Sequence, residues 1–206
     1  MTTPDELPLF PLQAVLFPGG LLGLKVFEAR YLDLISSCLR GRQPFGVVAL
    51  RSGHEVRAAD TDAVSFEPVG TLAELIDADS DVPGILEVSC RGTQRFRVLS
   101  SRQRKEDGLW LATTEPLPDD VALVPTEALS GAAQGLADAI KALKARQSEP
   151  FLQPYRLNDA GWVANRWCEI LPIPQAAKYK LMELEDPMAR LQLVDDYLRS
   201  KGVLTG

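Results

Sequence analysis

Residues 7–31 read LPLFPLQAVLFPGGLLGLKVFEARY, and this stretch decides the fold. It contains two short apolar runs, at 7–12 and 22–26, which have the length of β-strands. Between them stands Pro18-Gly19-Gly20, where proline fixes φ and glycine permits a positive φ, so we expect a turn. From Glu28 to Arg40 the apolar residues recur at helical spacing instead. The stretch therefore predicts strand, turn, strand and helix in that order.

Further short apolar runs follow as far as Pro118. Residues 85–99 form the clearest one, because apolar residues such as Val88 and Cys90 alternate with polar ones, and Gly92 marks a bulge or turn. Several short strands separated by glycine and proline favour a small antiparallel barrel, closed or nearly closed, that includes one helix. The predicted strands are 7–12, 22–26, 45–50, 69–76, 85–99 and 109–114.

After Pro118 the pattern changes to helices. Apolar residues recur every three or four positions between Thr126 and Arg146, and Asn158 is predicted to cap a second helix. Asp186-Pro187 is predicted to start the last helix, because aspartate accepts hydrogen bonds from free backbone N–H groups and proline loses none at the first position. The expected fold class is α+β, with a barrel domain at residues 1–118 and a helical bundle domain at residues 119–206.

The chain of 206 residues is acidic, with 22 Lys and Arg against 28 Asp and Glu and a net charge of −6. This total disfavours nucleic acid as a partner, since phosphate binding relies on an excess of Lys and Arg. One basic cluster stands out, and a solvated strand face accounts for it better than an RNA site. Its members are Arg91, Arg95, Arg97, Arg102, Arg104 and Lys105.

No targeting or membrane segment is visible in the sequence. No run approaches the roughly 20 apolar residues of a membrane-spanning helix, and residues 1–6 lack the basic and apolar parts of a secretory signal. The widely spaced Cys38, Cys90 and Cys168 are expected to be buried, reduced thiols. We therefore expect a cytoplasmic protein without a membrane partner.

The motifs of common enzyme classes are missing from the sequence. There is neither a phosphate-binding G-x-x-x-x-G-K-[ST] loop nor a G-x-S-x-G nucleophile elbow. The single histidine, His54, is expected at a surface turn. The acidic run Asp77 to Asp81 imitates a calcium loop, but Val82 and Val88 occupy the positions of the required glycine and glutamate. We predict no catalytic residue, no metal ligand and no cofactor, and hence no enzyme.

Several motifs together are similar to the Lon N-terminal domain family. Residues 7–31 carry the first of them, followed by V-G-T-L-A at 69–73 and G-T-Q-R-F-R-V at 92–98, and residues 176–191 resemble the family's C-terminal helices. The resemblance covers nearly the whole chain. The residues that carry it, here called the signature residues, are Phe10, Pro11, Phe17, Pro18, Gly19, Phe27, Glu28, Arg30, Tyr31, Gly70, Gly92, Arg95 and Phe96.

The resemblance implies a PUA-like β-barrel followed by a helical bundle. It also implies a role in engaging unfolded or tagged protein substrates, which this domain serves in Lon proteases before their ATPase and protease parts. Since the sequence stops at Gly206, we expect a stand-alone, non-catalytic module. Its expected partners are unfolded or exposed polypeptide segments, or a protease or chaperone. The signature residues are interpreted as mostly structural.

The expected contact surface is a groove between barrel and bundle, because such junctions favour ligands. Trp110, Trp162 and Trp167 are candidates for it only if they are exposed. Two alternatives remain open. One is RNA binding by a PUA-like barrel, supported only by the basic cluster, and the other is a small-molecule pocket inside the barrel.

Overall fold

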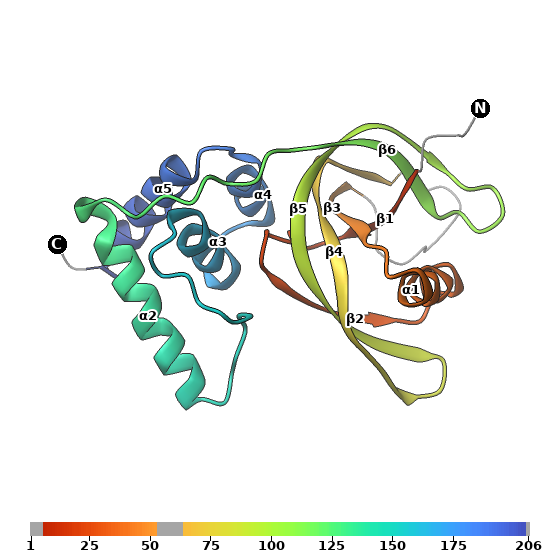
Figure 1. The fold of residues 1–206 in the computed structure, drawn as a ribbon, viewed down its shortest axis with the longest axis horizontal. Coiled ribbons are helices and arrows are strands. Elements are labelled where there is room, and N and C mark those ends of the chain that lie inside the picture. The colour runs from red at the N-terminus through yellow and green to blue at the C-terminus, as the bar shows by residue number, and fades with distance from the viewer. Residues whose placement is uncertain (1–5, 53–63, 205–206) are drawn as a thin grey trace. The chain divides into compact units, whose positions relative to one another are not determined.

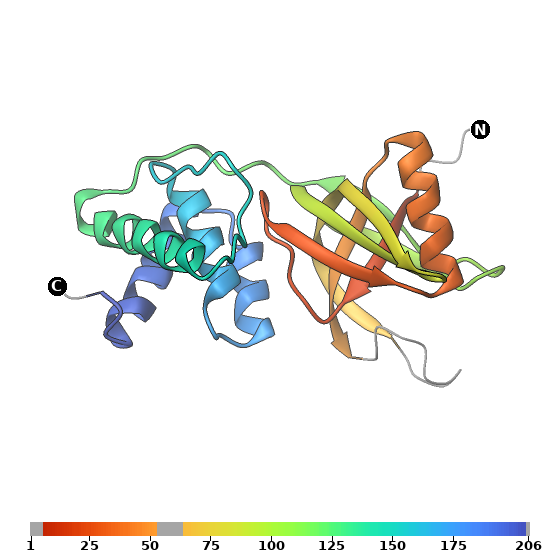
Figure 2. The ribbon, with the colours of Figure 1, turned by 90° about the horizontal axis from the view of Figure 1, so that it is seen from below.

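The first part of the chain folds into strands that wrap around a common interior (Figures 1 and 2). The computed structural model describes residues 6–52 and 64–204. Contacts within the chain divide it into two units, residues 1–118 (unit 1) and 119–206 (unit 2). His54 lies outside the described residues.

Unit 1 contains six strands and one helix among its described residues. In the sheet the strand order is β2-β5-β4-β3-β1-β6, and β5 pairs additionally with β6. The strands β5, β4, β3, β1 and β6 therefore form a closed ring of hydrogen-bonded neighbours, with β2 outside it. The elements are β1 (Leu7–Leu12), β2 (Leu21–Val26), α1 (Ala29–Gly41), β3 (Phe45–Ser52), β4 (Ser65–Val82), β5 (Ile85–Gln103) and β6 (Trp110–Pro116).

The expectation of a purely antiparallel sheet is wrong at one pair of strands. β1 and β3 are parallel, with Leu9 opposite Gly46 and Leu12 opposite Ala49. The reason is the connection between β1 and β3, which contains strand β2 and helix α1. Parallel neighbouring strands require a crossover connection of this kind. Every other recorded pair is antiparallel.

Both faces of β1 are buried, which explains why its sequence does not alternate with polar residues. Leu9 belongs to one cluster of buried side chains, together with Val48, Phe96 and Ala112. Phe10 and Leu12 belong to a second cluster, which includes Tyr31 and Ile35 of α1. The helix therefore covers one face of the sheet.

The loop before β2 is held against β5 by its backbone. Gly19 has a φ of 72°, as its position in the predicted turn requires, and its N–H donates to the Gly92 carbonyl at 2.8 Å. A Cβ on Gly92 would lie 2.3 Å from the Phe17 carbonyl oxygen, so only glycine fits there. The hydroxyl of buried Thr71 donates to the Leu16 carbonyl at 2.7 Å. These contacts between described residues fix the loop through uncharged groups.

Unit 2 is helical in its described part, with α3 packed against α2, α4 and α5. Asp159, rather than the predicted Asn158, caps α3 by accepting from the N–H groups of Gly161 and Trp162. Asp186 caps α5 as predicted, with Pro187 at its first position. The elements are η1 (Glu127–Leu129), α2 (Ser130–Ala145), α3 (Ala160–Ile170), α4 (Gln175–Glu183) and α5 (Pro187–Ser200). No helix in the described part of the chain is both long and apolar enough to span a membrane.

A buried arginine connects the pieces of unit 2. Arg190 on α5 is 1% exposed, and its guanidinium pairs with Asp120, the closest N–O distance being 2.5 Å. It also donates to Asn165 Oδ1 at 3.0 Å and to the carbonyls of Leu181 and Leu184. The segment before η1, helix α3 and the end of α4 are therefore all tied to α5 through one side chain.

Candidate functional site

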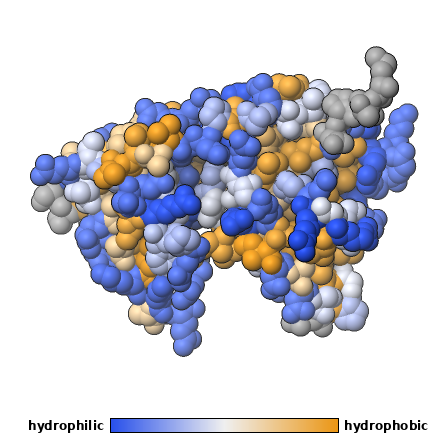
Figure 3. Space-filling view, viewed as in Figure 1, coloured by the Kyte–Doolittle hydropathy of each residue, from blue (hydrophilic) through white to orange (hydrophobic). Residues whose placement is uncertain are grey.

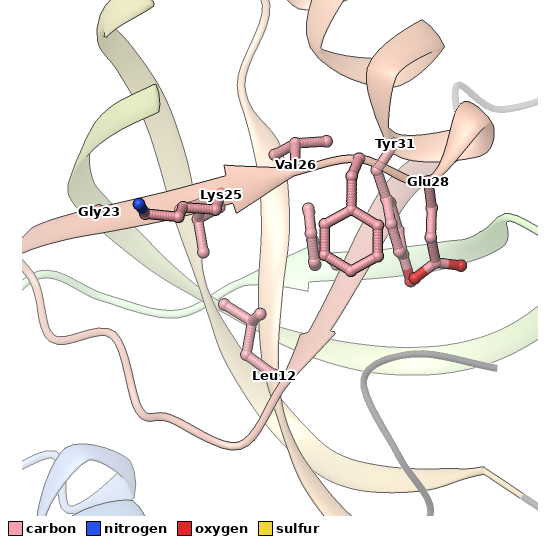
Figure 4. Close-up of a pocket in the computed structure, with 9 residues that line it drawn as sticks. Leu12, Gly23, Lys25, Val26, Glu28 and Tyr31 are labelled. Atoms are coloured by element: carbon pink, nitrogen blue, oxygen red, sulfur yellow. The ribbon is translucent and has the colours of Figure 1, made fainter. Parts of the chain in front are cut away.

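A cavity of about 280 Å³ opens beside β2, between this strand, β1 and the start of α1 (Figure 4). Leu12 and Val26 lie on opposite sides of it, and Glu28 and Tyr31 close one end. Apart from Lys25 and Glu28, the lining is apolar or glycine. The lining residues are Phe10, Leu12, Gly23, Leu24, Lys25, Val26, Phe27, Glu28 and Tyr31.

The end of the cavity at α1 is built from stacked groups. The rings of Phe10 and Tyr31 lie parallel, with centroids 3.9 Å apart. The guanidinium of Arg30 lies over the Tyr31 ring at 4.6 Å and pairs with the Glu28 carboxylate at 2.8 Å. Arg30 also donates to the Gly108 carbonyl, while its buried Nε has no acceptor among the described residues. These contacts hold Glu28 and Tyr31 in fixed positions.

The other wall of the cavity is the terminal strand of the sheet. β2 pairs with β5 along one edge, and no described strand lies along its opposite edge, which we call the outer edge. Leu22 and Leu24 pack partly against the second buried cluster, whereas Leu21, Gly23 and Lys25 are exposed. The strand therefore presents both apolar side chains and backbone polar groups next to the cavity.

Apolar side chains are exposed at the two ends of this strand. Phe27, directly after β2, is 53% exposed although it is a large aromatic residue, and Leu21 is 38% exposed. Figure 3 shows hydrophobic residues gathered over β2 and the segment before it. Contiguous exposed apolar surface is a common feature of binding sites, whereas single exposed apolar residues are ordinary.

Comparison with known proteins shows the family to which the chain belongs. The model of the ATP-dependent protease La (LON) substrate-binding domain matches residues 6–200. The chain belongs to this family. The match confirms the resemblance drawn from residues 7–31 and from the later motifs.

The relatives of this Lon domain are bacterial Lon proteases. The Lon protease of Anaeromyxobacter dehalogenans is 28% identical over 202 residues, covering 96% of this chain and 23% of that protein. Lon protease 2 of Myxococcus xanthus is 27% identical, covering 96% of this chain and 24% of that protein. The chain thus spans about a quarter of the length of these relatives.

Solved structures show the same fold. The Lon N-terminal domain protein from Xanthomonas campestris has a TM-score of 0.71 and 31% identity, covering 93% of this chain and 98% of that one. The N-terminal domain of a Mycobacterium avium complex Lon protease has a TM-score of 0.66 at 17% identity, covering 94% of this chain and 98% of that one. The second likeness concerns the fold alone.

The signature residues of this Lon domain separate into distinct groups. Phe10, Phe27, Glu28 and Tyr31 line the cavity, and Arg30 supports them. Phe17, Pro18, Gly19 and Gly92 belong to the loop before β2 and its contact with β5. Buried Phe96 lies near Gly70, whose Cβ would be 2.4 Å from the Val47 carbonyl oxygen. Pro11 is buried in β1. Thus a minority of the set gathers at the cavity, and the interpretation of the others as structural stays a prediction.

The three tryptophans differ in their exposure. Trp162 and Trp167 of α3 are buried, and the Trp167 indole N–H donates to the Ala132 carbonyl at 2.9 Å. Trp110 is half-buried against Phe66, with ring centroids 5.2 Å apart. The condition of exposure is therefore not met for the helical pair, because α3 is the central helix of unit 2. The groove expected between barrel and bundle stays a prediction.

The basic cluster is not a uniform solvated face. Arg95 is only 2% exposed and donates to the Pro118 carbonyl, which corrects the expectation that it faces solvent with Arg97. The main reason is that residues 117–118 follow β6 back over it, with the Leu117 N–H bonded to the Arg95 carbonyl. The other arginines pair with carboxylates, which reduces the local positive charge. These pairs are Arg91–Glu74, Arg97–Glu115, Arg102–Glu6 and Arg104–Asp107.

A second cavity, of about 270 Å³, opens in unit 1 at one end of the strand ring. It is lined by apolar residues such as Leu7 and Phe96, by the amides Gln43 and Gln94, and by the charged residues Glu6 and Arg95. Gln94 donates to the Leu117 carbonyl at 3.2 Å, so this amide is engaged within the protein. No group of acids, histidines or cysteines in the described ranges is placed to hold a metal ion.

The three cysteines are free and buried, as predicted. Burial raises the pKa of the Cys90 and Cys168 thiols to about 12. Thiolate is the reactive form of cysteine, so these groups are chemically inert at neutral pH.

Sequence reasoning missed the residues of β2 that line the cavity, above all Gly23, Leu24 and Lys25. A terminal strand and an interior strand can have the same composition, because position in a sheet depends on distant pairing partners. The one available signal is Phe27, a large aromatic residue between a strand and a helix.

Proposed function

We propose that this Lon domain binds exposed apolar segments of unfolded polypeptides at the cavity beside β2. The observation that carries the proposal is the combination of an apolar cavity with exposed Phe27 at its rim. The family description, a substrate-binding domain of an ATP-dependent protease, supports a polypeptide as the ligand. The role proposed is non-catalytic, on a strand ring of the PUA-like type.

The size of the cavity favours side chains over a cofactor. Sites for small molecules usually enclose about 300–1,000 Å³ and combine apolar walls with a few converging polar groups. This cavity, at about 280 Å³, lies at the lower end of that range, and its carboxylate Glu28 is already paired with Arg30. One or two apolar side chains of a client fit that description. Three buried thiols also fit a reducing compartment such as the cytoplasm.

The test compares two equally exposed apolar residues of unit 1. Phe27→Ser should weaken binding of a reduced, carboxymethylated protein about three- to tenfold, because it removes apolar contact area at the cavity rim. Leu39→Ser on α1 is the matched control, since Leu39 is 49% exposed and does not line the cavity. Binding is measured by fluorescence anisotropy of the labelled client.

Two outcomes contradict the proposal. One is no binding by the unmodified domain at high micromolar concentration. The other is equal binding by the Phe27→Ser and Leu39→Ser proteins, which would place the contact elsewhere.

A further inference from the structure

The outer edge of β2 offers hydrogen-bonding groups that the sheet itself does not use. In an antiparallel pair, successive residues direct their N–H and C=O alternately toward the partner and away from it. The Gly92 N–H donates to the Gly20 carbonyl at 2.9 Å, so Gly20 faces β5. With Leu22 paired to Cys90 and Leu24 to Val88, the same alternation turns the backbone groups of Gly23 and Lys25 outward.

Edge strands in proteins are usually protected by charged side chains, which discourage pairing with another chain. The part of β4 beyond Ala73, where pairing with β3 ends, carries exposed Asp77 and Asp79. β2 has a single charged residue, Lys25, and its ammonium group pairs with Glu87 on β5 at 2.8 Å. The Lys25 side chain remains 74% exposed in this pair, so one charged group protects this edge, against two on the free part of β4. The outer edge of β2 is therefore the less protected of the two.

The space beside Gly23 is open. A Cβ built on this residue would meet no atom within 4 Å. On the other face of the strand, Leu24 and Val26 line the cavity. A strand laid along β2 would therefore direct alternate side chains toward the cavity, because side chains of neighbouring strands share a face.

We propose that the polypeptide bound by this domain is held as an added β-strand on the outer edge of β2. The substrate class is then an extended segment with apolar residues at every second position, whose main chain bonds to Gly23 and Lys25. This inference rests on the proposed function and specifies how the client is recognised. Main-chain pairing of this kind gives affinity with little dependence on sequence, while the cavity selects the alternate side chains.

The decisive experiment uses two forms of one short labelled peptide of alternating leucine and serine. N-methylation of the serine amides blocks hydrogen bonds along one edge of the peptide strand, and N-methylation of the leucine amides blocks the other edge. One form should lose about tenfold or more in affinity and the other should bind as the parent peptide does. The form that loses affinity also reports direction: the serine form for antiparallel pairing and the leucine form for parallel pairing. Equal affinity of the two forms would overturn the proposal.

A pair of protein variants gives a second, independent reading. Gly23→Pro removes an outward N–H, and proline is tolerated at strand edges, while Gly23→Ala keeps the N–H. The alanine protein should bind the parent peptide at least about fivefold more tightly than the proline protein, with both shown to be folded by circular dichroism. Equal binding by the two folded variants would overturn the proposal.

Two further results have distinct meanings. If Phe27→Ser weakens binding but neither N-methylation nor Gly23→Pro does, the proposed function stands and strand addition is refuted. If the unmodified protein sediments as a dimer that Gly23→Pro dissociates, the outer edge pairs with a second copy of the chain, which also refutes the proposal.

Discussion

Two irregular segments of this molecule are fixed by different means. In unit 1 the loop at residues 13–20 is held by neutral groups, the Gly92 backbone and the Thr71 hydroxyl. In unit 2 the segment at residues 119–126 is held by an ion pair between Asp120 and buried Arg190. The loop in unit 1 is fixed by the close approach of two backbone segments. The segment in unit 2 is fixed by a charged side chain that is buried away from water.

The difference shows where a ligand can be accommodated. The neutral loop leads into β2 without any charged side chain, so the cavity and outer edge of that strand remain mostly apolar. The charged segment of unit 2 needs several fixed partners at once, since a buried cation without them is strongly unfavourable. Substitutions in β2 of unit 1 should therefore change ligand binding, and substitutions of Arg190 in unit 2 should change stability.

The largest loss of stability is expected from Arg190→Met. It removes the guanidinium that donates to Asp120 and to two backbone carbonyls, and breaking a buried pair in this way costs about 3–5 kcal/mol of unfolding free energy. Urea unfolding followed by the fluorescence of Trp162 and Trp167 measures the change. A loss below about 1 kcal/mol would show that the ion pair does not hold unit 2 together.

Two matched variants sharpen this result. Lys141→Met removes an exposed partner of Asp138 and should leave the unfolding midpoint unchanged. The double variant Arg190→Met with Asp120→Leu removes both charges, and we expect it to be more stable than Arg190→Met alone.

A smaller loss is expected from Gly92→Ala in unit 1. The new Cβ would lie 2.3 Å from the Phe17 carbonyl oxygen, so the loop before β2 must shift, which costs about 1–3 kcal/mol. Gly23→Ala is the stability control, because its Cβ meets nothing within 4 Å. Unfolding is followed by circular dichroism. Equal midpoints for the two variants would contradict the close backbone contact.

A further expected effect concerns the pH dependence of stability. Burial raises the pKa of the Glu169 carboxyl to about 7, against the opposing effect of its hydrogen-bonded partner Arg166. The unfolded chain therefore releases this proton first, near its ordinary value of 4.5, and the stability of unit 2 falls as pH rises from about 4.5 to 7. Glu169→Gln should flatten that decline in urea midpoints measured across this range.

The Asp107 carboxyl in unit 1 changes stability with pH in the opposite direction. A hydrogen bond from Arg104 holds the pKa of its carboxyl at about 2, below the ordinary 3.8. Its contribution is present above about pH 4 and is lost as pH falls toward 2. Asp107→Asn should therefore leave the decline between pH 4.5 and 7 intact. If Asp107→Asn flattened that decline, Glu169 would not be its source.

Most helices and strands were predictable because their signals are local. The alternation in residues 85–99 indicated β5, and Asp186-Pro187 indicated the start of α5. The parallel pairing of β1 with β3 was not predictable in this way, because both directions bury the same side chains. Arg95 was misplaced for a similar reason, since residues 117–118 cover it from more than twenty positions away in the chain.

The candidate site was predicted only in part. The signature residues Phe10, Glu28 and Tyr31 were identified by resemblance, but their meeting at one cavity depends on β1, β2 and α1 packing together. Gly23 and Lys25 gave no signal at all, because the outer edge of a strand is defined by the absence of a neighbour. Arg190 lies in the stretch 176–191 that was identified only by its resemblance to the family's helices, and its partners are spread from Asp120 to Leu184.

The pairing of β1 with both β3 and β6 has a consequence for synthesis on the ribosome. Leu9 pairs with Gly46 on one side and with Trp110 on the other, so the first strand to emerge is completed by the last strand of unit 1. Until residues near 116 have left the exit tunnel, one edge of the Leu7 to Leu9 segment stays open, and open apolar edges invite association. A nascent chain of this domain is thus, for part of its synthesis, itself an unfolded apolar polypeptide.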